Sequence, residues 1–127
     1  MRVYYEDTDA GGGVYYANYL RFLERARTEW LRALGFEQPE LADTHGVLFV
    51  VRAVNIEYLK PSRFNDSLQV TVEVVTVGGS RIRFLQRVLR GSEEVVRAEV
   101  DVVCVSTGTF RPARVPRAMR TTIGTEN

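Results

Sequence analysis

One long helix pattern, followed by a chain that reads almost entirely as strands, limits the folds open to this sequence. From Tyr16 or Ala17 to Leu34, apolar residues recur mostly at steps of three and four, the period of a helix with one buried face. Gly35 follows and suits a helix C-terminal cap. The apolar face is predicted to contain Leu20, Leu23, Ala26, Trp30, Leu31 and Leu34.

The remaining patterns predict a sheet that this helix covers. A short strand over 3–5 precedes the helix, and a second short helix over 39–44 follows it. Strand patterns then cover 47–58, 68–74, 82–88 and 95–105, with turn signals between them. The tail from Thr107 contains two prolines and is predicted to be irregular. This order predicts an α+β fold, with one long helix packed on an antiparallel meander.

Length and composition fit one ordinary globular domain over residues 1–127. Hydrophobic residues make up 45% and charged residues 26%, and the net charge of +1 does not favour nucleic acid as a partner. Cys104 is the only cysteine and lies in an apolar run, so we expect a buried thiol and a reducing, cytoplasmic location. We see no signal peptide, and the longest apolar run is too short for stable membrane insertion.

The segment YEDTDAGGGVYYANYL, residues 5–20, places acidic side chains and three glycines just before the long helix. A helix start exposes unpaired backbone N–H groups and a partial positive charge, which can hold a developing oxyanion. Glycine allows a sharp turn and a close approach to a substrate. A carboxylate beside such a site can attack a carbonyl carbon or activate water. Read without other information, an aspartate here is more often a turn former than a catalytic residue.

The segment YEDTDAGGGVYYANYLRFLERARTEWL resembles the opening of the hotdog-fold acyl-CoA thioesterases, in particular the bacterial Tol-Pal-associated branch. It is more distantly similar to 4-hydroxybenzoyl-CoA thioesterase. The resemblance continues through LFVVRAVNIEYLKPSRFND and AEVDVVCVS, and so covers nearly the whole chain. It implies a hotdog fold, a long central helix wrapped by an antiparallel sheet. It also implies sheets paired edge to edge in a homodimer or homotetramer, active sites at the dimer interface, and no cofactor or metal.

The resemblance also implies roles for particular residues. Asp9 matches the catalytic aspartate, as nucleophile or general base, and Glu6 and Asp7 are turn-forming or solvated. Tyr16 stands where the branch usually has histidine; its backbone N–H still serves as an oxyanion contact, while its ring either takes part or only packs over the cleft. Gly13, Val14 and Tyr15 are expected to contact the substrate.

Other candidates have weaker signals. Arg63, Ser80 and Arg81 are candidates for the phosphates of coenzyme A, although an arginine at a strand end is often a plain surface residue. Phe49, Val50 and Val51 either line the pantetheine or acyl channel or belong to the core. Glu24 matches a base position in a different hotdog branch, and we expect it to be solvated or ion-paired. Asn18 is expected to cap the helix, and His45 to lie on the surface.

Together these observations predict an acyl-CoA thioesterase that releases free CoA and a carboxylic acid. The alternative is a binding module for acyl-CoA or acyl carrier protein that kept the fold and lost turnover. Asp9 favours the enzyme, and the absence of the usual histidine at position 16 favours the binding module. The choice among acyl and aroyl groups does not follow from these residues.

Overall fold

The computed structural model describes residues 16–62 and 66–126. The long helix α1 spans Tyr16–Ala33, close to its predicted limits. It ends where Gly35 adopts a φ of 95°, and the Phe36 N–H donates back to the Leu31 carbonyl. The second helix, α2, spans Gln38–His45 and ends at Gly46, which has a φ of 65°. Both ends use glycine in the left-handed region that other residues rarely adopt.

The strands form one antiparallel sheet whose order differs from the predicted meander. They are β1 (Val47–Tyr58), β2 (Gln69–Val70), β3 (Glu73–Val77), β4 (Arg81–Arg90) and β5 (Glu93–Ser106). The order is β1-β5-β4-β2, and β3 also pairs with β4. The first strand therefore pairs with the last, from Val47 opposite Ser106 to Tyr58 opposite Val96. The strand predicted over 68–74 is broken at Thr71, whose hydroxyl accepts a hydrogen bond from the Arg87 N–H.

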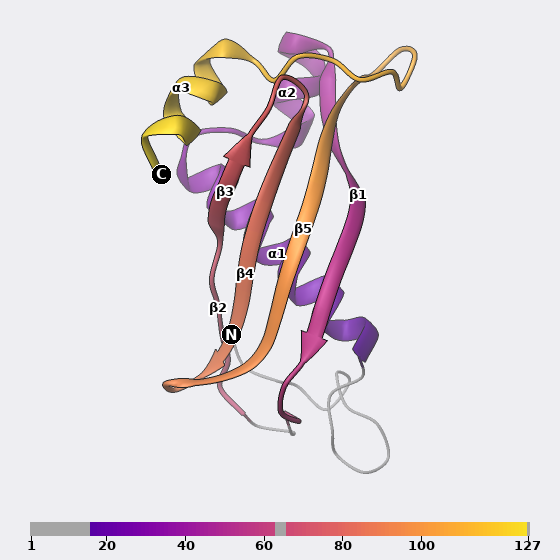
Figure 1. Ribbon diagram of the computed structural model, residues 1–127. Helices are drawn as coiled ribbons and strands as arrows, with labels where there is room; N and C mark the ends of the chain where they lie inside the picture. Colours follow the sequence, from indigo (N-terminus) through magenta and orange to yellow (C-terminus); the bar gives the residue numbers. More distant parts are fainter. Residues whose placement is uncertain (1–15, 63–65, 127) are drawn as a thin grey trace.

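Helix α1 lies across one face of the sheet, behind the strands in Figure 1. Alternate residues of β4 and β5 point toward it and are buried, such as Phe84, Val88 and Val100. On α1 itself the buried side chains are Tyr19, Phe22 and Leu23. Leu20, predicted for this face, is 44% exposed, because the stripe that contacts the sheet is centred on the aromatic residues beside it. The sequence-based prediction of an α+β fold is confirmed.

The prediction of an irregular tail from Thr107 is wrong for its last part, which forms a helix. A third helix, α3, spans Arg117–Glu126 and begins directly after Pro116. Met119 and Ile123, one helical turn apart, are 1% and 0% exposed, and Val115 is buried just before the helix. Figure 1 shows α3 beside β3, at the end of the sheet where α2 lies. This i, i+4 apolar pair gives the short helix a buried stripe. The two prolines upstream had favoured an irregular tail over this helix.

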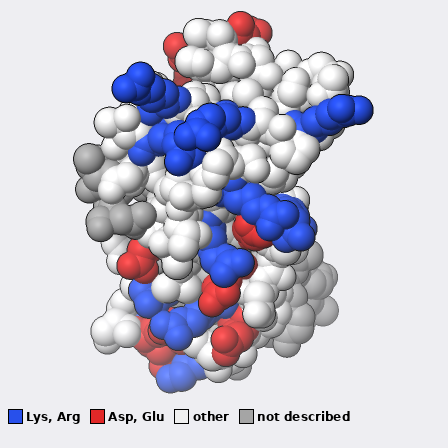
Figure 2. Space-filling model, turned by 45° about the horizontal axis from the view of Figure 1, so that its top comes forward, with Lys and Arg blue, Asp and Glu red and all other residues white. Residues whose placement is uncertain are grey.

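The outer face of the sheet carries charges of both signs. Arg52 pairs with Asp101 at 3.0 Å, and Arg97 pairs with Glu94 at 3.2 Å. Figure 2 shows acidic and basic side chains next to one another over the lower part of the view. Exposed pairs of this kind contribute little to stability, but they keep a face hydrated.

Candidate functional site

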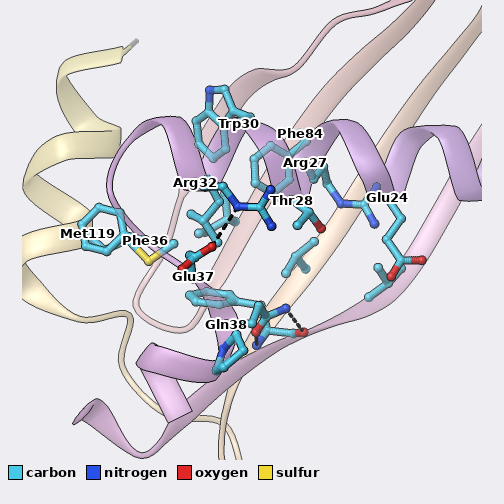
Figure 3. A pocket seen from close by; sticks show the side chains of 16 residues that line it. Glu24, Arg27, Thr28, Trp30, Arg32, Phe36, Glu37, Gln38, Phe84 and Met119 are labelled. Carbon is cyan, nitrogen blue, oxygen red and sulfur yellow. Dashed lines mark hydrogen bonds and ion pairs between the residues drawn. The ribbon is translucent and has the colours of Figure 1, made fainter. Parts of the chain in front are cut away.

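A pocket of about 380 Å³ lies between the second half of α1, the start of α2 and the sheet (Figure 3). This volume falls within the range of small-molecule sites. Six of the described elements contribute to it: the helices α1, α2 and α3, the strand β1, and the central strands β4 and β5, which form the floor. The lining residues are Glu24, Arg27, Thr28, Trp30, Leu31, Arg32, Phe36, Glu37, Gln38, Pro39, Phe49, Val51, Ile82, Phe84, Val102 and Met119.

The floor of the pocket is apolar and partly aromatic. Ile82, Phe84 and Val102 come from β4 and β5 and are 1% to 5% exposed. The rings of Trp30 and Phe84 meet edge to face, with centroids 5.4 Å apart. Met119 reaches the pocket from α3. A surface of this kind is suited to an alkyl or aryl group.

The polar groups at the rim near α2 are occupied by one another. Arg32 Nε donates to Glu37 Oε1 at 2.8 Å. The Gln38 amide donates to the Phe49 carbonyl at 3.2 Å and accepts from the Phe49 N–H at 3.0 Å. Figure 3 shows both interactions as dashed lines beside the cavity. The start of α2 is thereby fixed to β1, which gives this wall of the pocket a defined position.

A second polar group, Arg27, is held from beneath by a buried glutamine. Arg27 Nη1 donates to Gln86 Oε1 at 2.9 Å. Gln86 is 0% exposed, and its amide nitrogen donates to the carbonyls of Leu23 at 3.1 Å and Thr71 at 3.4 Å. Burial lowers the pKa of the Arg27 guanidinium, and the nearby charge of Glu24 partly offsets this effect. The side chains that flank α1 on this side are therefore not equivalent, since Glu24 is exposed and Arg27 is half-buried.

At its other end, α1 meets the end of β1. The rings of Tyr19 and Tyr58 have centroids 5.9 Å apart. Burial raises the pKa of the Tyr19 phenol, an effect opposed by the neighbouring Ser62 hydroxyl and by the charge of Arg90. Tyr19 is therefore a neutral phenol at physiological pH. Asn18 is buried beside it.

The predicted site residues divide into three groups. Asp9, Gly13, Val14, Tyr15 and Arg63 lie outside the described residues, and for Tyr16 only the backbone at the start of α1 is described. Phe49 and Val51 line the pocket. Val50 lies between them on the strand and is 36% exposed.

Of the remaining predicted residues, Ser80 lies in the turn between β3 and β4, and Arg81 is the first residue of β4. The Ser80 carbonyl accepts a hydrogen bond from the Cys104 N–H at 2.7 Å, and Arg81 is exposed. Neither residue lines the pocket. Two of the less specific predictions are confirmed: Cys104 is buried, and His45 is exposed at the end of α2.

Sequence reasoning missed the pair of Arg27 and Gln86. A signal was present for each. Gln86 occupies an inward position of a strand whose other inward residues, Phe84 and Val88, are apolar. Arg27 follows Leu23 by four residues and therefore shares the buried face of the helix. Each of the two residues is polar at an otherwise apolar position of its element. Such a pattern predicts that the two side chains contact each other, because a buried polar group needs a partner.

Among residues 16–62 and 66–126, no group of three or more histidine, cysteine or acidic side chains is placed to hold a metal ion. Within the same part of the chain, no helix has the length and apolar character needed to cross a membrane.

Comparison with known proteins places this arrangement in a family. The model of the thioesterase-like superfamily matches residues 3–123, and the chain belongs to that superfamily. The acyl-CoA thioesterase YbgC of Haemophilus influenzae is 45% identical over 120 residues, which cover 94% of this chain and 88% of the relative. The acyl-CoA thioester hydrolase YbgC of Escherichia coli O157:H7 is 43% identical over 120 residues, 94% of this chain and 89% of the relative.

Solved structures agree with the fold. A probable thioesterase from Bartonella henselae superposes with a TM-score of 0.86 at 35% identity, covering 91% of this chain and 95% of that one. A 1,4-dihydroxy-2-naphthoyl-CoA thioesterase from Synechocystis has a TM-score of 0.89 at 21% identity, covering 98% and 92%, and shows the likeness of fold alone. The predicted hotdog fold is confirmed.

Proposed function

We propose that this protein is an enzyme that hydrolyses an acyl-CoA thioester to free CoA and a carboxylic acid. The observation that carries this proposal is membership of the thioesterase-like superfamily over residues 3–123. Relatives named as an acyl-CoA thioesterase or an acyl-CoA thioester hydrolase are 43% to 45% identical to this chain over 94% of its length. The apolar pocket between α1 and the sheet supports the same function, since it suits the acyl group of such a substrate.

The reaction is assigned to the start of α1. The thioester carbonyl would lie at the free N–H groups there, which stabilise the oxyanion as the carbonyl carbon becomes tetrahedral. Asp9 would either take a proton from the attacking water or attack the carbon itself and then be regenerated by water. In both routes the carbon–sulfur bond breaks and the CoA thiolate leaves and takes up a proton. Support comes from the position at which α1 begins, Tyr16, which follows Asp9 by seven residues in the sequence.

We further propose that a second copy of the chain completes the site. From Tyr16 to Thr28, twelve residues on, α1 rises by roughly 18 Å. A thioester at the start of the helix would thus need a long acyl group to fill the pocket of the same protomer. The edge strand β1 exposes Val50, Val51, Val54 and Tyr58, by 36% to 47%, and Leu59 follows it. Apolar edge strands are normally covered.

A twofold axis at this edge would bring the two parts of the site together. Antiparallel pairing of two β1 strands continues the sheet, and the two α1 helices then run in opposite directions on the same face. The start of one helix would lie toward the pocket-bearing half of the other. Arg63, Ser80 and Arg81 remain candidates for the CoA phosphates in this arrangement, and Phe49 and Val51 for contacts with the acyl group.

Two substitutions test the assignment of roles. Asp9→Asn keeps size and most hydrogen bonds but removes the charge, so turnover should fall by about two to four orders of magnitude, as on loss of a general base. Tyr16→Phe keeps the backbone N–H, so its turnover should fall by less than about tenfold. Release of free thiol from a panel of acyl- and aroyl-CoA substrates measures both.

Three outcomes would change the proposal. Equal damage from Tyr16→Phe and Asp9→Asn would make the phenol a direct participant. An active wild type that neither substitution affects would place the catalytic site elsewhere. A wild type that binds acyl-CoA without releasing thiol would support the non-catalytic binding module.

A further inference from the structure

We propose that the pocket selects acyl groups with a carboxylate at the end remote from the thioester, and that Arg27 binds this carboxylate. The inference rests on the proposed thioester hydrolysis. It names the chemical class of the acyl group, which the comparisons leave open.

Two cations line the pocket, Arg27 and Arg32. Arg32 is committed to Glu37 at 2.8 Å. Arg27 has no carboxylate within ion-pair distance among the described residues, and it donates a hydrogen bond to the neutral oxygen of Gln86. Arg27 is therefore the pocket cation left without a carboxylate in this part of the chain.

Gln86 fixes how Arg27 is presented. Its amide nitrogen donates to two backbone carbonyls, those of Leu23 and Thr71, so its oxygen must face Arg27. One N–H of the guanidinium is taken by that oxygen. A guanidinium carries five N–H donors in a rigid plane, so others remain for a ligand. The group is held in place before any ligand arrives, which lowers the entropic cost of binding.

The surroundings favour an anion over an alkyl chain end. Arg27 is half-buried, so its charge is only partly solvated, and this burial lowers the pKa of its guanidinium. A plain alkyl group would complete the removal of water and provide no partner, which is costly for a buried charge. A carboxylate would neutralise the guanidinium and form charge-assisted hydrogen bonds. Glu24, which would repel this carboxylate, is exposed at the rim, where water screens its charge.

The methylene or aryl part of such an acyl group would lie against the aromatic side chains of the pocket. Trp30 and Phe84 meet edge to face on the floor, and Phe36 and Phe49 lie on the side toward α2. Figure 3 shows Arg27 and Thr28 on α1 at one side of the cavity and Gln38 at the other. An apolar floor, beside one wall cation that has no carboxylate partner among the described residues, matches an apolar chain with one terminal anion.

Matched substrate pairs test the inference. Hexanoyl-CoA and adipoyl-CoA have acyl chains of equal length and differ in the terminal carboxylate. We expect wild-type kcat/KM to favour adipoyl-CoA by about tenfold or more, the size of one charge-assisted hydrogen bond. In Arg27→Met, the ratio of the two kcat/KM values should fall by about tenfold or more. Butyryl- with succinyl-CoA and octanoyl- with suberoyl-CoA extend the test to other pocket depths.

Control variants separate charge from folding. Arg25→Met changes an exposed arginine on the same helix outside this pocket, and should keep the wild-type ratio. Arg27→Lys keeps the charge without the planar fork, and should retain part of the preference. If Arg27→Met does not fold, Arg27→Lys and the binding of free adipate and hexanoate to the wild type, measured by calorimetry, decide the matter. Adipate should bind about tenfold more tightly.

The outcomes for the two proposals are distinct. Turnover of the alkyl thioesters with no preference for a terminal carboxylate in any pair would overturn the inference and leave thioester hydrolysis intact. An unchanged ratio in Arg27→Met would also overturn it. If no thioester were hydrolysed, the proposed function would fail, and calorimetry with the free acids would still decide whether Arg27 selects a carboxylate.

Discussion

Gln86 shows how one polar residue in a strand can position a helix. It lies on β4 among inward-facing apolar residues and is fully buried. A buried amide without partners would be destabilising, but here both ends are used: the nitrogen by Leu23 and Thr71, and the oxygen by Arg27. The same residue thus ties the middle of α1 to the sheet and aligns the arginine that faces the pocket.

Cys104 is a residue whose reactivity is lowered by its position in the core. It is 0% exposed, its thiol lies 3.8 Å from the Arg114 carbonyl, and burial raises its pKa. We expect the native protein to react with a thiol reagent such as dithiobis(nitrobenzoate) at less than about a hundredth of the rate of the protein unfolded in denaturant. Fast labelling under native conditions would show that the strand opens.

The direction of the pKa shift also fixes a pH dependence. Because the folded-state pKa of Cys104 is raised above the unfolded value, its contribution to stability is complete below the unfolded pKa. That contribution is lost as the pH rises through the folded pKa. Cys104→Ala should therefore weaken the loss of stability that the protein shows under alkaline conditions, as measured by urea unfolding at two pH values.

At the scale of elements, α3 is the segment whose role differs most from expectation. It packs beside β3 and contributes Met119 to the pocket, so the end of the chain helps to shape the candidate site. Arg120 Nη1 also donates to the Gly78 carbonyl in the turn between β3 and β4. The shape of the pocket and the docking of α3 are therefore linked through the same end of the sheet.

Met119→Ala tests this docking. The side chain is 1% exposed, and its removal from a packed site should lower the free energy of unfolding by about 2–4 kcal/mol. Arg117→Ala, at an exposed position of the same helix, should change it by less than about 0.5 kcal/mol. Urea denaturation measures both. A Met119→Ala variant as stable as the wild type would mean that α3 is not packed on the sheet in solution.

The whole molecule has an asymmetric sheet, with a hydrated outer face and an apolar edge. Ion pairs such as Arg52 with Asp101 occupy the outer face. At the β1 edge, Val54 is 37% exposed although it shares the inner face with Ile56, which packs against the core. A second copy joined at this edge would provide the missing cover.

Val54→Lys tests that assembly. A lysine at an apolar edge would oppose sheet pairing, so we expect a dimer or tetramer in the wild type and monomers in the variant, by light scattering at micromolar concentration. Thiol release should fall with the loss of assembly. Val75→Lys is the matched control, because Val75 is 48% exposed on β3, away from the β1 edge. A monomeric wild type would contradict the proposal of a site shared between two copies. Dissociation by Val75→Lys would indicate that the interface lies at β3 instead.

What the sequence alone determined was set by patterns within a few residues. The period of apolar residues located α1, Gly35 its end, Pro39 the second helix, and the alternation in 82–88 the central strand. These features depend on backbone hydrogen bonds and on which side of an element each residue points, and both are local. Phe49 and Val51 were also found on a strand that lines the pocket. The acidic loop with Asp9 was identified by resemblance, and its role stays a prediction.

The tertiary structure decided which of these elements meet. The pairing of β1 with β5 joins segments about fifty residues apart, and no local pattern distinguishes it from a meander. The burial of Gln86, the docking of α3 and the pocket itself each depend on side chains from several elements packed together. Such contacts are chosen by the shape and polarity of the assembled core, so the same residue can be surface in one pairing and core in another.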